Sequence, residues 1–481
     1  MSTLPILWLP LAVLALAVVV LVFDAFAAPT PAGKRAPTIT LAAVGLLGIF
    51  SASFVFETTG VAAFGVYEAS AWSVYLQRLF LAAGVLGLLG AEAELRTRTP
   101  RRQGEYVLLL LFSLVGMVVL PGARDLLLLT VAFELMGLPL YVLAGFAKTD
   151  GLGEEKTRAS EAAIKLYLVG ATSTAVTLFG LALVTGSAGT TRLAGLGNAP
   201  GTPLFAVGLA LVLAGLGYKL GVVPFHMWVP DTYQGARTPF VAFLSVAPKA
   251  AGVAAIAQIF LLGLARDRAH WLPVIGLFAL LSMAVGNLLA LAQTDLRRLL
   301  GYSGIAQMGY LLVGVAANDA KSLGMVLFFL SAYLFTNLGA FLVVYAAAEA
   351  GGGYGFEGLA GLSRRAPGLS IALLSFVLSL AGIPFVVGFW AKLFVLVAAW
   401  QAGLSALVVS AVVAAVVALF YYLRILHAAY MHDSALPVPS PGRALGSAVA
   451  VCTLLVIGLG LYPRPLVESS AAAASALLSG R

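Results

Sequence analysis

The feature that most constrains the fold of this chain is a succession of long apolar runs separated by short polar connections. Most runs approach or exceed the about 20 residues that an α-helix needs to cross a lipid bilayer. Apolar residues make up 61% of the 481 residues and charged residues only 10%, whereas a soluble domain carries about 25% charged residues. Lipid tolerates only segments whose backbone hydrogen bonds are satisfied internally. The sequence therefore predicts a bundle of transmembrane helices.

Fourteen runs are long enough to span the membrane, and they predict an all-α polytopic membrane protein. The predicted spans are 4–26, 38–56, 72–92, 105–121, 125–147, 161–185, 203–228, 239–264, 271–292, 299–317, 322–348, 369–397, 403–426 and 443–462. The first is interpreted as a retained span rather than a signal peptide, because no basic residue precedes it and it is longer than the apolar region of a signal.

The distribution of Lys and Arg between the spans predicts the orientation. Connections that follow odd-numbered spans contain sixteen of these residues, and the other connections with the C-terminal tail contain seven. Because basic residues accumulate in cytoplasmic loops, both termini are predicted to be periplasmic, in a bacterial inner (cell) membrane. This scattered pattern accounts for the net charge of +8 without nucleic acid as a partner.

Charged residues inside the predicted spans are the main candidates for function. The five basic ones are Arg78, Lys165, Lys219, Lys249 and Lys392, and Glu134 is the one acid at mid-span. Inserting a charged side chain near the bilayer centre costs at least about 2.5–3.5 kcal/mol, so each of these charges is expected to have a polar or oppositely charged partner. Lys165 and Arg78 keep a structural alternative, since Lys165 lies near the start of its span and can extend to the membrane surface. Glu134 and Lys219 are predicted to form a buried pair, in which a lysine can exchange a proton near neutral pH.

Two similar phrases contain a proline within an apolar run. They are YKLGVVPFHMW, with Pro224, and LAGIPFVVGFWAKL, with Pro384. A proline removes a helical hydrogen bond, so predicted helices 7 and 12 are expected to be broken. The phrases lie five spans apart and therefore run in opposite directions, as the inverted repeats of transporters do. We predict N-terminal helices 1–3 in residues 1–104, a first five-helix repeat in 105–264, a second, inverted five-helix repeat in 265–427 and a C-terminal helix 14 in 428–481.

Several kinds of centre are excluded by what the sequence lacks. A single cysteine, Cys452, is too few for a thiolate-held iron–sulfur cluster or a disulfide framework in this chain. The glycine-rich GGGYGFEG at 351–358 lies between two predicted spans, without the strand of a dinucleotide-binding fingerprint. No ATP-binding P-loop is present and no metal site is predicted. The energy source is therefore expected to be an ion gradient or a partner protein.

Five stretches of the chain resemble a known family. They are FELMGLPLYVL (133–143), YKLGVVPFHMWVPDTYQGARTP (218–239), FLSVAPKAAG (243–252), DLRRLLGYSGIAQMGYLLVG (295–314) and GIPFVVGFWAKLFVL (382–396). Together they resemble the antiporter-like membrane subunits of respiratory complex I. Within that family, SVAPKAA and YYLRIL (421–426) favour subunit N of NADH:quinone oxidoreductase.

The resemblance implies a role in proton transfer for each of five buried charges. It implies that Glu134 pairs with Lys219 and that Lys165 tunes this pair. It further implies that Lys249 relays protons along a hydrated axis in the middle of the membrane and that Lys392 stands near the exit. The chain departs from the family pattern at GARTP and at PFVVGF, and both departures bear on gating.

The resemblance also implies which molecules surround the chain. NADH, FMN, iron–sulfur clusters and quinone are expected in partner subunits, with no redox cofactor in this chain. The expected partners are other complex I subunits, especially neighbouring membrane-arm subunits, together with membrane lipid. The alternative is an Mrp-type cation/proton antiporter subunit or a membrane-bound hydrogenase subunit of the same fold. A purely structural spacer is disfavoured because it has no use for charges at mid-depth.

Overall fold

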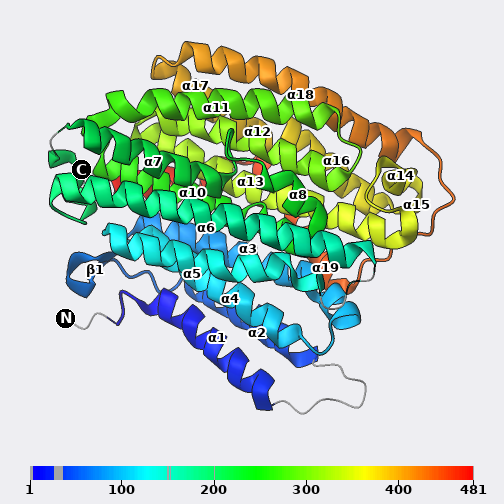
Figure 1. Ribbon diagram of the computed structural model, residues 1–481. Helices are drawn as coiled ribbons and strands as arrows, with labels where there is room; N and C mark the ends of the chain where they lie inside the picture. Colours follow the sequence, from blue (N-terminus) through cyan, green and yellow to red (C-terminus); the bar gives the residue numbers. More distant parts are fainter. Residues whose placement is uncertain (1–3, 27–35, 149–150, 152, 200, 480–481) are drawn as a thin grey trace. The chain divides into compact units, whose positions relative to one another are not determined.

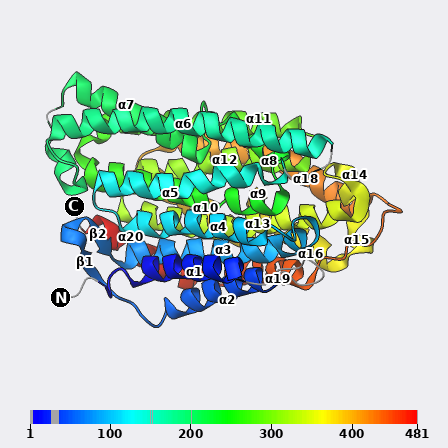
Figure 2. The ribbon, with the colours of Figure 1, turned by 60° about the horizontal axis from the view of Figure 1, so that its bottom comes forward.

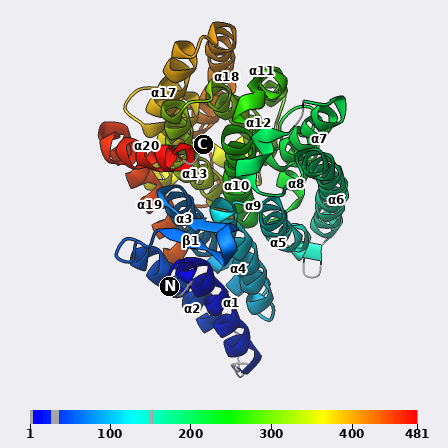
Figure 3. The same cartoon turned by 90° about the vertical axis from the view of Figure 1, so that its left-hand side faces the viewer.

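Helices dominate the computed structural model, which describes residues 4–26, 36–148, 151, 153–199 and 201–479. Twelve helices in this part of the chain are long and apolar enough to cross a membrane, and three shorter apolar helices accompany them. The prediction of a polytopic helical membrane protein is confirmed. One departure from an all-α fold is a hairpin in which β1 (Gly60–Ala62) pairs antiparallel with β2 (Tyr67–Ala69). Figure 3 shows this hairpin beside the start of α3 (Ala71–Arg98).

Packing divides the chain into two compact units, each assembled from separate stretches of sequence. The first unit contains Met1–Lys219, Ala247–Leu272 and Ala472–Arg481, and the second contains Leu220–Val246 and Pro273–Ala471. The predicted domain boundaries rest on a different criterion, the internal repeat, and stay a prediction.

The first unit brings α4 and α5 into close contact. Its main helices are α1 (Trp8–Phe26), α2 (Ala36–Ala52), α3, α4 (Gln103–Val119), α5 (Leu126–Ala144), α6 (Glu154–Ala188), α7 (Pro203–Leu220) and α10 (Ala247–Ile256). Gly116 of α4 lies against the α5 backbone at Ala132 and Met136, where a Cβ atom would clash. The Ser113 hydroxyl of α4 donates to the Met136 carbonyl at 2.9 Å. These contacts fix the rotation of α5.

The other face of α5 is covered by α6, and Figures 1 and 2 show the two helices side by side. α6 in turn packs closely on α7, because Gly180 and Gly208 each lie against the carbonyl oxygen of the other. The Ser173 hydroxyl of α6 donates to the Gly215 carbonyl of α7 at 2.9 Å. Small residues at helix contacts thus bring α5, α6 and α7 close enough for their polar side chains to meet.

The second unit is built around α12 and α13. Its helices are α8 (Trp228–Gly235), α9 (Thr238–Leu244), most of α11 (Arg268–Leu291), α12 (Leu296–Ala317), α13 (Ala320–Ala347), the short turns η7 (Ala348–Gly352), α14 (Phe356–Leu359) and α15 (Leu362–Arg365), and then α16 (Pro367–Ala381), α17 (Val387–Gln401), α18 (Ser405–Met431) and α19 (Arg443–Leu461). α12 and α13 are buried along nearly their whole length. α8, α9, α16 and α17 pack around them. Helices that are apolar on every side take such central positions.

Both predicted helix breaks are present. The chain leaves helical conformation between α7 and α8 over residues 221–227, and between α16 and α17 over residues 382–386. A glycine in the left-handed region begins each break, Gly221 with φ +68° and Gly382 with φ +85°. Glycine adopts this conformation without the steric cost that a Cβ atom would bring, and it commonly ends helices in this way.

The sequence predicted neither of two further features. The span expected over 239–264 is present as one apolar crossing, Thr238–Gly263. It is not one regular helix, because α9 ends before residues 245–246 and α10 follows, continued by the π-helical segment η5 (Ala257–Gly263). The C-terminal tail contains an additional helix, α20 (Arg464–Leu478). Its apolar positions are mostly alanines, so it does not stand out as an apolar run.

Candidate functional site

The first candidate site lies in the first unit, where three helices contribute one polar side chain each. Lys219 stands in the last turn of α7, Glu134 in the middle of α5 and Thr174 in the middle of α6. The Lys219 Nζ atom lies 3.7 Å from Glu134 Oε1. The same oxygen accepts a hydrogen bond from Thr174 Oγ1 at 2.8 Å. The predicted Glu134–Lys219 pair is therefore present in the structure, with a third residue that the sequence analysis missed.

A small cavity of about 20 Å³ adjoins these three side chains. Its remaining lining is almost entirely apolar and comes from Leu129, Thr130, Phe133, Thr177, Leu178, Leu181, Leu216 and Ile259. A space of this size holds about one water molecule, provided that polar groups can bind it. The Lys219–Glu134 separation exceeds the usual 2.7–3.2 Å of an N–H···O hydrogen bond. The ion pair is thus open by a fraction of an ångström beside a water-sized space.

The surroundings of the Lys219 ammonium show why α5 carries a glycine at position 137. A Cβ atom at Gly137 would lie 3.3 Å from Lys219 Nζ and 3.5 Å from Tyr141 Oη. The ammonium also lies 5.7 Å from the centroid of the Phe133 ring, within range of a cation–π attraction. The lysine therefore packs directly against α5, and its alkyl chain is largely buried.

Lys165 forms an ion pair on its own helix. Its Nζ atom lies 2.5 Å from Glu161 Oε1, one turn earlier on α6, and 41% of its side chain is exposed. Thr174 follows nine residues later, which is about 13 Å along an α-helix. In this structure Lys165 is therefore placed apart from Glu134, and the tuning role that the resemblance implies stays a prediction.

Lys249 is among the most deeply buried side chains of the first unit, with 1% of its surface exposed. It belongs to α10, in which every residue is buried. This helix contacts α3, α4 and the turn that follows α4. A lysine is rarely this inaccessible in a protein. Its predicted relay role is not tested by this placement.

The second candidate site lies in the second unit, at the break between α16 and α17. Lys392 of α17 donates from Nζ to the Leu380 carbonyl at 2.7 Å and to the Ala381 carbonyl at 3.4 Å. Both carbonyls belong to the last turn of α16, where the helix dipole is negative and carbonyl groups lack helical partners. The ammonium also lies 4.7 Å from the centroid of the Tyr310 ring. The broken helix thus provides the partner that the sequence analysis expected for this charge.

Polar side chains of α12 extend this second site. Gln307 Nε2 donates to the same Leu380 carbonyl at 3.0 Å and to Tyr422 Oη at 3.1 Å. Tyr422 Oη also shares a hydrogen bond of 2.6 Å with Ser303 Oγ. A cavity of about 10 Å³ adjoins Gln307 and Lys392. The sequence analysis missed these residues, although the spacing of Ser303, Gln307 and Tyr310 indicates one polar face within an apolar helix.

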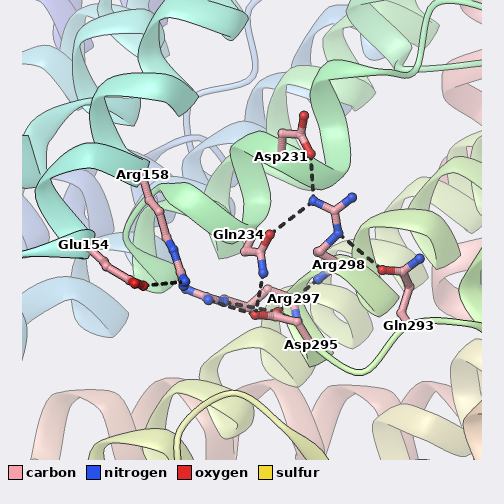
Figure 4. Close-up of polar contacts among 8 residues, drawn as sticks. All are labelled: Glu154, Arg158, Asp231, Gln234, Gln293, Asp295, Arg297 and Arg298. Atoms are coloured by element: carbon pink, nitrogen blue, oxygen red, sulfur yellow. Dashed lines mark hydrogen bonds and ion pairs between the residues drawn. The ribbon is translucent and has the colours of Figure 1, made fainter.

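A third polar cluster, shown in Figure 4, joins α8 to the start of α12 in the second unit. Arg298 lies 2.6 Å from Asp231 and donates to Gln234 at 3.1 Å. Arg297 lies 2.9 Å from Asp295, which caps α12 by accepting the backbone N–H groups of both arginines. The sequence analysis treated these arginines as topology signals alone. The structure shows that they also hold two elements together.

The remaining charge that the sequence placed within a span, Arg78, has structural contacts. It pairs with Glu57 at 2.5 Å and donates to the Ser53 carbonyl at 2.5 Å. Its guanidinium lies 4.1 Å from the centroid of the Phe54 ring. Arg78 thus fixes the segment that follows α2 to α3. No group of three or more His, Cys, Asp or Glu residues suited to a metal ion occurs within the described part of the chain.

Comparison with known proteins gives a consistent result. Residues 123–418 match the family described as NADH:quinone oxidoreductase/Mrp antiporter, transmembrane. The chain is 39% identical over 448 residues to NADH-quinone oxidoreductase subunit N of Sphingopyxis alaskensis, with 91% of each chain covered. It is similar to a chain of respiratory complex I from Thermus thermophilus with bound aureothin, with a TM-score of 0.81, 31% identity, and 96% of this chain and 99% of that chain covered. A chain of the Mrp complex from Dietzia sp. DQ12-45-1b shares the fold, with a TM-score of 0.87 at 23% identity and 99% and 98% coverage.

Proposed function

The chain belongs to the NADH:quinone oxidoreductase/Mrp antiporter transmembrane family, and we propose that it is the proton-translocating subunit N of a complex I-type NADH:quinone oxidoreductase. It couples electron transfer in partner subunits to proton movement across the membrane. The observation that carries this proposal is the pair of opposite charges, Glu134 and Lys219, held 3.7 Å apart beside a water-sized cavity. Such a pair is costly within a membrane, and a subunit that served only as a spacer would gain nothing from it.

The proposed mechanism is electrostatic switching by Glu134. At 3.7 Å, two unit charges attract each other by about 4 kcal/mol at an effective dielectric constant of about 20. Moving one charge against 100 mV of membrane potential requires about 2.3 kcal/mol. Withdrawal of Glu134 therefore changes the free energy of protonated Lys219 by more than the work of moving one charge against about 100 mV. A disturbance that starts in the redox subunits and moves Glu134 makes Lys219 take up or release a proton.

The other buried lysines are proposed to handle the proton further along. In the first unit, Lys249 receives it, which its nearly complete burial within α10 supports. In the second unit, Lys392 holds it near the exit, supported by the two α16 carbonyls that stabilise its ammonium. Lys165 tunes the central pair from a distance through its charge, which Glu161 balances at 2.5 Å on the same helix.

We further propose fourteen crossings with two inverted five-helix repeats. The count of fourteen follows when α2 and the broken pair α16–α17 are added to the twelve long apolar helices. Support for the repeats comes from the two matching breaks, each begun by a glycine with positive φ. With this count, the distribution of basic residues places both termini on the periplasmic side of a bacterial cell membrane.

The proposal assigns the redox chemistry to partner subunits. NADH, FMN, iron–sulfur clusters and quinone bind there, and this chain contributes no redox step. Neighbouring membrane-arm subunits and lipid surround it. The Mrp-type antiporter alternative is favoured less, because the likeness to the Mrp chain concerns the fold at 23% identity, whereas the identity to subunit N of Sphingopyxis alaskensis is 39%.

The test is Lys219→Ala in the complex purified with its native partners and reconstituted into liposomes. Proton pumping, measured by quenching of a pH-sensitive dye, should fall strongly relative to the rate of quinone reduction, because the central titrating group is removed. Assembly should be largely retained, since the Glu134 carboxylate keeps its hydrogen bond from Thr174 when the ammonium is removed. An assembled variant that pumps at the wild-type proton-to-electron ratio would contradict the proposed role.

A further inference from the structure

We propose that Thr174 is a positioning residue that holds the Glu134 carboxylate in its withdrawn position. This inference rests on the proposed role of the Glu134–Lys219 pair. Thr174 Oγ1 donates to Glu134 Oε1 at 2.8 Å, while Lys219 Nζ lies 3.7 Å from the same oxygen. The carboxylate therefore accepts a hydrogen bond from the Thr174 hydroxyl group, whereas the Lys219 ammonium lies too far away to donate one.

The lining of the cavity gives this hydroxyl its importance. Leu129, Phe133, Leu178, Leu181, Leu216 and Ile259 offer no hydrogen bond to a carboxylate. The other two hydroxyl groups of the lining, on Thr130 and Thr177, donate to carbonyl groups of their own helices. A carboxylate that leaves the ammonium in such surroundings needs another donor, because an unsatisfied charged group is strongly disfavoured. Thr174 supplies that donor from the neighbouring helix. Glu134 thus has two satisfied arrangements, one on Thr174 and one on Lys219, and a switch requires such a pair of states.

The hydroxyl of Thr174 differs from those of other threonines on α6. Thr172, Thr177 and Thr185 donate to carbonyl groups of their own helix at 2.8–2.9 Å, which is the usual arrangement for threonine in a membrane helix. Thr174 instead donates across to α5. Thr185 lies on the same helix outside the cavity lining, and its hydroxyl group donates only to carbonyl groups of α6, so it provides a matched control.

The experiment compares Thr174→Val, Thr174→Ser and Thr185→Val in the whole reconstituted complex. Valine has nearly the shape of threonine without its hydroxyl group, and serine keeps the hydroxyl group. Thr174→Val should lower the proton-to-electron ratio at least twofold. Thr174→Ser should restore most of it, and Thr185→Val should pump as the wild type does.

A second readout separates positioning from packing. Infrared difference spectra of the complex contain the carboxylate stretching band of Glu134, which is assigned by its absence in Glu134→Gln. Thr174→Val should shift this band, because the carboxylate loses a hydrogen bond, and Thr174→Ser should leave it in place. A packing defect alone would not move it. If Thr174→Val assembles poorly, Thr174→Ala is compared with Thr185→Ala by the same two measurements.

Three results would overturn the inference while leaving the proposed function intact. In the first, Thr174→Val pumps as the wild type does and its infrared band is not shifted. In the second, the two valine variants lose pumping equally and the band does not move. In the third, Thr174→Ser fails to restore pumping. In each case Lys219→Ala, measured in parallel, still loses pumping. Wild-type pumping in Lys219→Ala would instead contradict the proposed function itself.

Discussion

Replacing Glu134 tests the central pair most directly, because the size of the effect follows from its geometry. Glu134→Gln removes a charge that lies 3.7 Å from the Lys219 ammonium. The attraction lost is about 4 kcal/mol at an effective dielectric constant of about 20, which corresponds to about a thousandfold change in the proton equilibrium of the lysine. We expect pumping to fall to a small fraction of the wild-type rate.

Glu134→Asp keeps the charge but retracts it by one methylene group, about 1.5 Å. The attraction across about 5 Å is then about 3 kcal/mol. The loss of about 1 kcal/mol corresponds to about a fivefold change in the equilibrium. The order of pumping rates should therefore be wild type, then Asp, then Gln. Dye quenching in energised vesicles, normalised to quinone reduction, measures this order. Equal pumping in the Gln variant and the wild type would show that the carboxylate charge is not used.

Three further experiments test other contacts and the topology. Gly137→Ala should raise helix stability by up to about 1 kcal/mol but lower pumping, since its Cβ atom would lie 3.3 Å from the central ammonium; unchanged pumping would show that this contact is unimportant. A cysteine that replaces Arg98 should react with an impermeant reagent only from the cytoplasmic side, and a cysteine that replaces Arg266 only from the opposite side. Labelling of both from one face would refute the fourteen-span topology. Arg298→Gln should destabilise the chain by about 1.5–3 kcal/mol through loss of the 2.6 Å contact with Asp231. In thermal melting of the complex, adding Asp231→Asn to Arg298→Gln should lower the stability little further. Losses of stability that add fully would contradict a direct interaction between the two side chains.

The second candidate site has a different physical basis from the first. The partners of Lys392 are neutral carbonyl groups at the end of α16, so its ammonium does not depend on a carboxylate. Gln307 shares one of these carbonyls and is itself held by Tyr422. A charge stabilised by fixed dipoles responds less to the movement of one side chain than a charge stabilised by a mobile carboxylate. This difference agrees with a switching role for the first site and a holding role for the second.

The amino-acid sequence by itself determined the class of the fold and the pair at its centre. Transmembrane helices follow from apolar runs, because the requirement for internal backbone hydrogen bonds acts locally along the chain. The breaks at residues 221–227 and 382–386 follow from proline and glycine, which act locally as well. Glu134 and Lys219 could be paired in advance because each is costly alone within a span.

Apart from the Glu134–Lys219 pair, only the tertiary structure decided which groups the buried polar side chains meet. Thr174 donates to Glu134 of α5 instead of to its own helix, and Lys392 of α17 donates to a carbonyl group of α16. Each choice depends on which residues of neighbouring helices come within about 3 Å, and close contacts through glycine and serine set those distances. Periodicity along one helix indicates which face is polar, but only the positions of the other helices determine what that face meets.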